Sequence, residues 1–347
     1  MFIKNKPFLI AEISANHCGN YNIAKKLIKT AKDNKADAVK LQTFEADTIT
    51  LNSNKKFFKI QGTIWHGYNL WKLYDEAHTP KIWHKKLFDY AKKIKIKIFS
   101  TAYDDTAVDF LEKLKCPAYK IASFEMTDVN LLEKIAKTKK PMIISTGMAN
   151  LNEIDRAVFT VRKFGCRDLT LLYCVSKYPS DVKDFNMNNI NILKQRYKCR
   201  IGFSDHSKDN RVAIAAVAAG AEVVEKHIAL ENQKKGLDIK FSIKGKEIKK
   251  FKEDITFSYN LSSHSKFFRT KEELKNKVFR RSVFAVSDIK KGEKLTTKNI
   301  KRIRPGHGLD PYYYKKILGK KTPFHISKGD PLNNKLLKIL KIKKINS

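Results

Sequence analysis

Short runs of apolar residues alternate with amphipathic segments along the first 230 residues. Eight such runs occur, at residues 8–13, 38–41, 96–100, 118–121, 141–145, 169–173, 200–203 and 223–225. Between most of them, apolar residues recur at helical spacing, at residues 23–34, 83–93, 106–114, 130–138, 152–164 and 210–219. Because strands that are apolar throughout are covered on both faces, eight of them alternating with helices predict a closed α/β fold, the (β/α)8 TIM barrel.

Polar residues gather at the C-terminal ends of these runs. The residues at or just after a predicted strand end are Glu12, Lys40, Gln42, Thr101, Lys120, Ser123, Ser145, Ser176, Tyr178, His206 and His227. A barrel of this type builds its active site on the face formed by the strand C-termini. Since randomly placed polar residues would fall equally often before the strands, this distribution predicts an enzyme site on that face.

Residues 44–80 interrupt the alternation after the second run. The segment is rich in aromatic residues, namely Phe57, Phe58, Trp65, Tyr68, Trp71 and Tyr74. A long loop on the catalytic face is typical of a lid or a specificity element. The alternative is a packed excursion that buries these rings elsewhere.

The pattern changes after residue 261. Residues 262–278 are polar and charged, and residues 279–340 contain short strand-like runs separated by Gly and Pro. The length of 347 residues fits a barrel of roughly 250 residues followed by a small domain. We therefore predict a catalytic barrel at 1–261, a linker at 262–278 and a small, mostly β domain at 279–340.

The charge of the chain invites a different interpretation. The formal net charge is +36, and a basic surface neutralises nucleic-acid phosphates. The lysines, however, are spread almost uniformly over the sequence, and no arginine-rich stripe with interleaved aromatics occurs. We expect no nucleic-acid partner. A polyanion-binding protein on a degenerate barrel is the alternative from another functional class.

The cysteines and the apolar runs indicate the compartment. Five widely spaced cysteines without a CxxC motif are typical of free thiols in a reducing environment. No apolar run approaches the roughly 20 residues that span a bilayer, and the N-terminus has no signal-peptide core. We expect a cytoplasmic protein without a membrane partner.

Two histidines are candidate metal ligands. His206 follows the seventh run and His227 the eighth. Adjacent strands lie about 4.8 Å apart, so imidazoles at neighbouring strand ends can share one ion, with Asp205 or Glu225 as orienting partners. Imidazole ligands favour Zn, Fe or Ni, whereas two histidines with several waters suit Mn or Mg. The residues alone leave the metal open.

Two lysines at strand ends indicate an anionic substrate. Lys40 and Lys120 serve either as Schiff-base nucleophiles, as in aldolases, or as cations that bind phosphate or carboxylate. Hydroxyl groups accompany them, at Thr101, Ser123, Ser145 and Ser204. Each hydroxyl alone is also explained as a helix cap, but the group favours a ligand with many oxygens.

The motifs together resemble the sialic acid synthase family. The matching segments are residues 11–17 (AEISANH), 40–43 (KLQT), 119–123 (YKIAS), 144–148 (ISTGM), 202–206 (GFSDH) and 225–227 (EKH). Residues 280–282 (RRS) through 304–308 (RPGHG) are similar to the antifreeze-like (SAF) domain of that family. The resemblance covers nearly the whole chain and implies a TIM barrel followed by an SAF domain.

The resemblance also implies a reaction. A divalent ion, Mn²⁺ with Mg²⁺ or Co²⁺ as alternatives, binds an open-chain acetamido-hexose and polarises its aldehyde. C3 of phosphoenolpyruvate attacks the aldehyde, water adds to the oxocarbenium at C2, and phosphate leaves by C–O cleavage. The family further implies a homodimer in which the SAF domain reaches over the partner's barrel.

Residue roles carry over from the matching motifs. The resemblance implies that His206 and His227 hold the metal. The implied catalytic residues are Glu12, Gln42, Tyr178 and Glu225. Phosphoenolpyruvate would be held by Lys40, Thr101, Lys120, Ser123, Ser145 and Ser204, which makes both lysines cations. The sugar would lie near Glu125, Ser176, Asp238 and, across the dimer, Arg304.

Two segments indicate a branch of the family. Residues 176–179 read SKYP where the N-acetylneuraminate enzymes have Asn-x-Tyr-Pro. Residues 62–67 (GTIWHG) and 73–80 (LYDEAHTP) resemble the pseudaminic acid synthase branch, whose acceptor is a 2,4-diacetamido-2,4,6-trideoxy-altropyranose. A sugar without a 6-hydroxyl suits a lid with aromatic, apolar surface. Synthesis of N-acetylneuraminate or legionaminate is the alternative activity.

Overall fold

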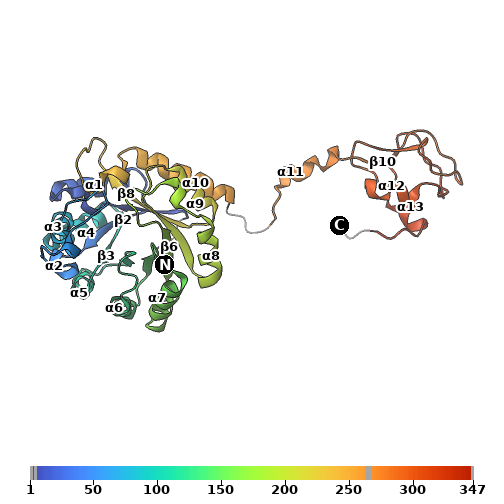
Figure 1. Cartoon of the computed structure of the whole chain (residues 1–347). Helices are drawn as coiled ribbons and strands as arrows, with labels where there is room; N and C mark the ends of the chain where they lie inside the picture. The colour runs from blue at the N-terminus through green and yellow to red at the C-terminus, as the bar shows by residue number, and fades with distance from the viewer. Residues whose placement is uncertain (1–2, 4–5, 263–266, 345–347) are drawn as a thin grey trace. The chain divides into compact units, whose positions relative to one another are not determined.

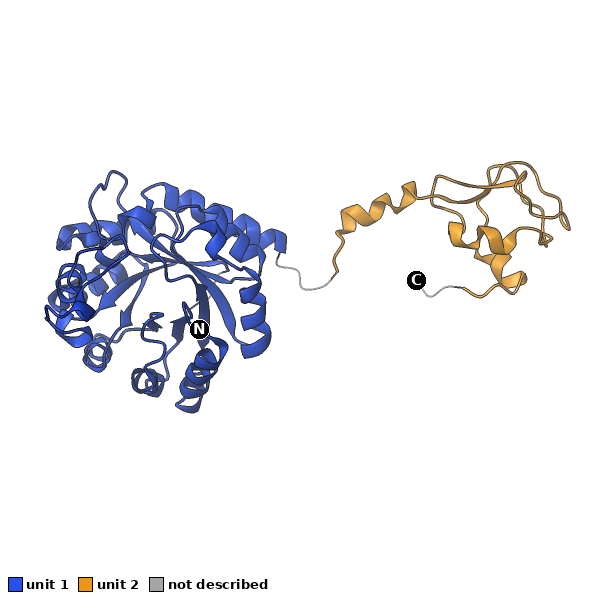
Figure 2. Ribbon diagram, in the orientation of Figure 1, with its two compact units in different colours: residues 1–265 blue, residues 266–347 orange. Residues whose placement is uncertain are grey.

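The chain divides into two compact units, Met1–Ser265 and Lys266–Ser347 (Figure 2). The computed structural model describes residues 3, 6–262 and 267–344. Residues 263–266 of the predicted linker lie outside the described residues. The rest of that predicted linker contains helix α11 (Lys271–Lys275) and a 3-10 turn at Asn276–Phe279.

Eight parallel strands form a closed barrel in the first unit (Figure 1). They are β1 (Phe8–Glu12), β2 (Ala38–Thr43), β3 (Lys97–Ala102), β4 (Tyr119–Ile121), β5 (Met142–Ser145), β6 (Leu169–Cys174), β7 (Arg200–Asp205) and β8 (Val223–Ala229). Each strand pairs with the next, and β8 pairs with β1. The predicted barrel is confirmed, and each of the eight apolar runs supplies one strand.

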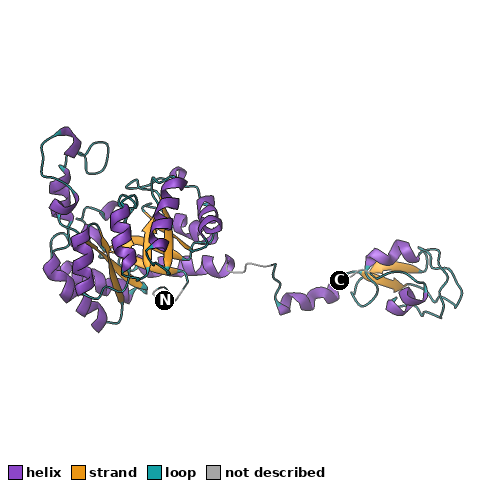
Figure 3. Ribbon diagram, turned by 90° about the horizontal axis from the view of Figure 1, so that it is seen from below, coloured by secondary structure: helices purple, strands orange, loops and turns teal. Residues whose placement is uncertain are grey.

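Helices surround the strands and bury one apolar face against them (Figure 3). Six match predicted segments: α1 (Tyr21–Asp33), α4 (Lys81–Lys93), α5 (Asp105–Lys113), α6 (Val129–Lys137), α7 (Leu151–Lys163) and α9 (Arg211–Ala218). In α6 the buried positions Leu131, Leu132, Ile135 and Ala136 recur at helical spacing. No helix in the described part of the chain is long and apolar enough to cross a membrane.

Two longer helices were not predicted. Helix α8 (Asn188–Tyr197) begins without a side-chain cap and buries only Ile190, Leu193 and Tyr197, so its pattern is weak. Helix α10 (Glu247–Ser262) follows the short strand β9 (Ile243–Lys244). It is tied to α9 by the hydroxyl of Ser258, which donates to the Ile214 carbonyl (2.8 Å).

The insertion after β2 contains α2 (Ala46–Ile49), a 3-10 turn at Lys56–Phe58 and α3 (Leu70–Ala77). Two buried histidines attach its C-terminal end to the barrel. His17 Nε2 lies 3.2 Å from Thr79 Oγ1. His84 Nδ1 donates to the Pro80 carbonyl (3.2 Å), so its Nε2 accepts from Thr43 Oγ1 (2.8 Å). Burial lowers the pKa of both histidines to about 4, which keeps them neutral.

The second unit has its own apolar core. Strands β10 (Ser282–Ala285) and β11 (Ile300–Ile303) pair antiparallel, and α12 (Tyr314–Ile317) and α13 (Asn334–Ile339) complete the unit. The core residues are Val283, Ala285, Ile289, Leu295, Ile300, Leu309, Tyr313, Ile317, Ile326, Leu332, Leu336 and Leu337. A second core is what an independently folded module requires.

Candidate active site

The parallel register of the barrel brings charged side chains together inside its C-terminal end. Glu12 lies opposite Lys40 on one side and His227 on the other. Because side chains alternate along a strand, Glu225 and His227 share one face of β8. Lys226 lies between them on the opposite face and pairs with Asp205 (2.9 Å).

Six of the predicted residues form one buried cluster, which we call the polar floor: Glu12, Lys40, Thr101, Lys120, Ser204 and Glu225. Lys40 pairs with Glu12, lies 3.6 Å from Glu225 Oε2 and donates to Thr101 Oγ1 (2.9 Å). Glu225 Oε1 lies 3.2 Å from Lys120 Nζ and accepts from the Ser204 hydroxyl (3.1 Å). Two cations and two anions therefore balance each other in the barrel interior.

Burial makes this balance necessary, since an unpaired charge in the interior costs several kcal/mol. Burial opposes ionisation of Glu225, but Lys120 and Lys40 hold the pKa of that carboxyl well below its usual range. Burial lowers the pKa of Lys120, against the effect of Glu225. The polar floor thus presents two clustered ammonium groups to a small anionic ligand.

Hydroxyl groups extend the polar floor at the ends of β4, β5 and β6. Ser123 Oγ accepts from the Gly147 backbone N–H (3.1 Å) and lies 3.2 Å from Cys174 Sγ. A Cβ on Gly147 would lie 2.1 Å from Ser176 Oγ, so glycine permits this convergence. Ser145 Oγ is buried and has no hydrogen-bond partner among the described residues, which leaves it available to a ligand. Cys174 was missed because nothing in the sequence marked it.

His206 and His227 lie side by side, with ring centroids 5.6 Å apart. The Val175 carbonyl accepts from His206 Nδ1 (3.0 Å), and Asp238 Oδ2 lies 3.4 Å from His227 Nδ1. Both neighbours lie at Nδ1, although only His206 Nδ1 forms a hydrogen bond, and Nε2 of each ring is the atom that could bind a ligand. Burial, followed by the neighbouring His227, lowers the pKa of His206 to about 3, so its imidazole stays neutral as a metal ligand must.

This donor set fits a divalent ion held by two imidazoles. Within the described ranges, no group of three or more His, Cys, Asp or Glu side chains is arranged to bind a metal. Water or substrate oxygens would therefore complete the coordination. The two predicted orienting partners have other contacts: Asp205 pairs with Lys226, and Glu225 belongs to the polar floor. The Val175 carbonyl lies at His206 Nδ1 and Asp238 at His227 Nδ1 instead. Both groups come from loops, which the strand pattern of the sequence does not locate.

Three rings, which we call the aromatic wall, extend outward from the histidine pair: Tyr178 and Phe241 contact it, and Trp65 contacts Tyr178. The Tyr178 ring lies 4.4 Å from His206 and 5.5 Å from Phe241, and Phe241 lies 4.9 Å from His227. The Trp65 ring lies 5.6 Å from Tyr178. The insertion therefore reaches the catalytic face, as expected for a specificity element. Phe241 was not predicted, because a lone Phe after the eighth strand looks like any core residue.

The remaining predicted residues occupy different environments. Burial raises the pKa of Glu125 to about 7, and its Oε2 has no hydrogen-bond partner in the described part of the chain. Gln42 lies two residues after Lys40 on β2, on the same face, and is partly buried. Arg304 is exposed in the second unit, directly after β11.

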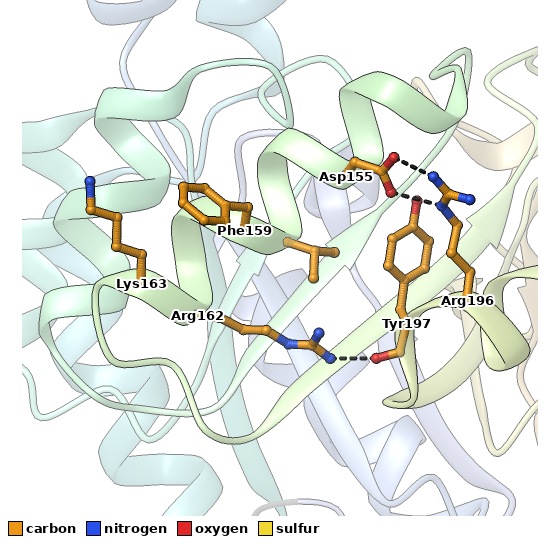
Figure 4. A pocket seen from close by; sticks show the side chains of 7 residues that line it. Asp155, Phe159, Arg162, Lys163, Arg196 and Tyr197 are labelled. Carbon is orange, nitrogen blue, oxygen red and sulfur yellow. Dashed lines mark hydrogen bonds and ion pairs between the residues drawn. The ribbon is translucent and has the colours of Figure 1, made fainter.

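A hollow on the outer surface of the barrel lies apart from these residues. It has a volume of about 660 Å³ and is lined by α7 and α8 (Figure 4). Arg196 pairs with Asp155, Arg162 donates to the Tyr197 carbonyl, and Lys163 Nζ lies over the Phe164 ring (5.4 Å). The hollow therefore offers a mostly apolar surface, and two of its three cations are already paired, so it has few polar groups to orient a substrate.

Comparison with known proteins decides the family. The NeuB family model matches residues 27–266, and the SAF domain model matches residues 280–338. The chain belongs to the NeuB family. This membership confirms the resemblance drawn from the strand-end motifs and the two-domain order.

Several NeuB relatives match over almost their whole length. The pseudaminic acid synthases of Campylobacter jejuni and Helicobacter pylori are each 41% identical, over 94% of this chain and 95% and 96% of theirs. The N,N'-diacetyllegionaminic acid synthase of C. jejuni is 37% identical over 91% of this chain and 95% of its own.

A solved structure supports the same assignment. The N-acetylneuraminic acid synthetase of Leptospira borgpetersenii is 31% identical and covers 79% of this chain and 90% of its own, with a TM-score of 0.71. Phospho-2-dehydro-3-deoxyheptonate aldolase of Thermotoga maritima, at 12% identity and a TM-score of 0.55, shares the fold.

Proposed function

We propose that this NeuB-family chain is a pseudaminic acid synthase. It condenses phosphoenolpyruvate with the aldehyde of a 2,4-diacetamido-2,4,6-trideoxy sugar and with water, giving a nonulosonic acid and phosphate. The identity of 41% to pseudaminic acid synthases over 94% of the chain carries this proposal. The lower identity of 37% to a legionaminic acid synthase makes legionaminate synthesis the second candidate.

The polar floor suits the phosphoenolpyruvate half of the reaction. Lys40 and Lys120 would bind the carboxylate and phosphate as cations, and the hydroxyls of Ser123, Ser145 and Ser204 would donate to their oxygens. Glu225 holds the two ammonium groups 3.6 and 3.2 Å from its oxygens, so both are already oriented before substrate arrives. This arrangement lowers the reorganisation needed for binding.

The histidine pair suits the aldehyde half. His206 and His227 would hold a divalent ion, which we propose to be Mn²⁺ with Mg²⁺ or Co²⁺ as alternatives, and this ion would supply Lewis-acid polarisation of the aldehyde. Glu12 and Glu125 would move protons, Gln42 would position the sugar, and Tyr178 would exclude water from the histidine pair.

We propose the following bond changes for the condensation. C3 of phosphoenolpyruvate forms a bond to the aldehyde carbon, and the aldehyde oxygen takes up a proton. Water then adds at C2 with loss of a proton, and the tetrahedral intermediate releases phosphate through cleavage of the C2–O bond. The atoms balance as phosphoenolpyruvate plus sugar plus water giving nonulosonate plus phosphate.

An isotope experiment tests the reaction class. Phosphoenolpyruvate labelled with ¹⁸O in the bridging position is incubated with Mn²⁺ and a panel of acetamido-hexoses, and products are identified by mass. We expect one ¹⁸O in each released phosphate and highest turnover with the altro-configured 6-deoxy sugar. Phosphate without label, or borohydride trapping of pyruvate on Lys120, would contradict this mechanism in favour of a Schiff-base aldolase.

We further propose a cytoplasmic homodimer in which Arg304 of one chain binds the sugar in the other chain's barrel. Subunit mixing tests this arrangement. Arg304→Ala and Lys120→Met are each expected to be weakly active alone, whereas mixed dimers contain one barrel with an intact lysine beside an intact Arg304. Recovery of activity on mixing supports the proposal, and no recovery despite demonstrated subunit exchange would overturn it.

A further inference from the structure

We infer that Trp65 is a specificity-determining residue that selects acceptor sugars lacking a 6-hydroxyl. Its indole ring packs against the C6 methyl group and gives a hydroxymethyl group no polar partner. This inference deepens the proposed function and rests on it. Four observations support it: how Trp65 is held, what it contacts, which ring separates it from the histidine pair, and how its one polar atom is used.

A small hairpin holds Trp65 at the edge of the site. Residues Lys59 and Asn69 form an antiparallel bridge, and the Ile60 N–H donates to the Tyr68 carbonyl (2.9 Å). At the tip, the backbone N–H of Trp65 donates to Thr63 Oγ1 (3.1 Å), and the Trp65 carbonyl accepts from the Tyr68 N–H (3.1 Å). The backbone of Trp65 is therefore held in a hydrogen-bonded turn, which restricts the direction of its side chain.

Trp65 contacts both loops that position the histidine pair. Its indole N–H donates to the Leu237 carbonyl (3.3 Å), and the next residue, Asp238, faces His227. Its ring lies 5.6 Å from Tyr178, which in turn lies 4.4 Å from His206. Trp65 thus stands one ring further from the histidines than Tyr178, at the outer end of the aromatic wall.

The length of the sugar matches this position. In the proposed reaction the aldehyde carbon, C1, lies at the histidine pair. Five C–C bonds of about 1.5 Å place C6 of an extended six-carbon chain roughly 6 Å further away. A sugar that starts at the histidines and follows the aromatic wall past Tyr178 therefore brings its C6 end to Trp65.

The chemistry of Trp65 favours a methyl group at that end. The indole N–H is its one polar group, and Leu237 already occupies it. A hydroxyl placed against the ring would lose water without gaining a hydrogen bond, whereas a methyl group gains apolar contact. A hydrophobic pocket rejects an added hydroxyl by a factor of up to about 100.

The insertion contains a matched control. Trp71 lies on α3 and its indole N–H donates to Asp47 Oδ1 (2.6 Å), within the insertion itself. Among the described residues, no ring contact joins Trp71 to the aromatic wall. Removing Trp71 therefore perturbs the insertion without removing the proposed contact to C6.

The test compares two acceptors that differ only at C6, the 6-deoxy sugar and its 6-hydroxy counterpart. We expect the unmodified enzyme to prefer the 6-deoxy sugar by about 10- to 100-fold in kcat/KM. Trp65→Ala should reduce this preference at least tenfold through KM for the 6-deoxy sugar, with KM for phosphoenolpyruvate unchanged within twofold. Trp65→Phe should keep most of the preference, and Trp71→Ala should keep all of it.

Tryptophan fluorescence provides a readout that does not depend on turnover. The 6-deoxy sugar should quench emission of the unmodified enzyme and of Trp71→Ala, but not of Trp65→Phe. Equal loss of kcat/KM on both sugars, or an unchanged preference in a Trp65→Ala enzyme with normal thermal unfolding, would overturn the inference. Failure of the unmodified enzyme to condense phosphoenolpyruvate with any sugar would overturn the proposed function instead, while quenching would still report whether the sugar lies at Trp65.

Discussion

The polar floor and the aromatic wall differ in how the chain builds them. The floor residues lie on barrel strands, where backbone pairing fixes each one; Glu12, for example, lies opposite both Lys40 and His227. The wall residues lie outside the strands: Trp65 comes from the insertion, and Tyr178 and Phe241 from the segments after β6 and β8. The polar floor lies on rigid strands and suits phosphoenolpyruvate, the substrate proposed for its lysines. The aromatic wall lies on loops and suits the sugar, which is the substrate that varies between enzymes.

The largest predicted effect comes from a substitution in the polar floor. Lys120→Met removes a buried cation and leaves Glu225 with one ammonium partner instead of two. Losing a buried charged partner costs about 3–5 kcal/mol, so kcat/KM for phosphoenolpyruvate should fall by about a thousandfold. Steady-state kinetics at saturating sugar measures it.

A surface lysine provides the control for that loss. Lys29 forms an exposed ion pair with Asp33 on α1 (2.7 Å), and Lys29→Met should leave kcat/KM unchanged because exposed pairs contribute little. A drop of less than tenfold in Lys120→Met would mean that the lysine does not hold the anion.

The second prediction concerns how the insertion is anchored. His17 and His84 have a pKa of about 4 in the folded protein against 6.5 in the unfolded chain, so the unfolded chain binds more protons between these values. Their contribution is complete above pH 6.5 and is lost as the pH falls towards 4. The unfolding free energy should drop by about 2 kcal/mol per histidine at pH 5.

Denaturant titrations between pH 7 and pH 4.5 measure this dependence. The double variant His17→Gln, His84→Gln is expected to be less stable at pH 7 but to lose less stability on acidification. If its pH dependence matched that of the unmodified protein, the histidines would not carry the effect.

A smaller effect is expected where floor and wall meet, at the histidine pair. Asp238→Asn keeps the size of the side chain but removes the charge that faces His227 Nδ1. Loss of such an orienting partner lowers metal affinity by about 10- to 100-fold. Calorimetric titration with Mn²⁺ measures it, and unaltered affinity would show that Asp238 serves the sugar alone.

The smallest effect should come from outside both regions. Arg196→Gln breaks the exposed pair with Asp155 beside the hollow between α7 and α8. We expect unchanged kinetics with both substrates and little change in the thermal unfolding temperature, because exposed ion pairs contribute little to stability. A marked loss of activity would place part of the function at this hollow.

The strand-borne part of the site was predictable from the sequence, and the loop-borne part less so. Apolar runs locate strand ends, and strand ends locate Lys40, Lys120 and both histidines. The positions of partners such as Asp238 and the Val175 carbonyl depend on the paths of loops, which the periodicity of the sequence does not predict. Phe241 and Cys174 show the same limit, since their residue types are common in any core. Helix α8 was not predicted, because its three buried residues stand among asparagines and charged residues and form a weak pattern.

The alternation along β8 has a consequence for how the protein reaches its working state. Glu225 and His227 face one side of the strand and Lys226 the other, where it meets Asp205. A chain that closed its last strand one residue out of register would exchange these two sides. It would leave Lys226 without its carboxylate and remove an acid and a metal ligand from the cavity together. The protein should therefore be active only after β8 has paired with β1 and β7 in the correct register. Recovery of turnover during refolding would report when this pairing forms.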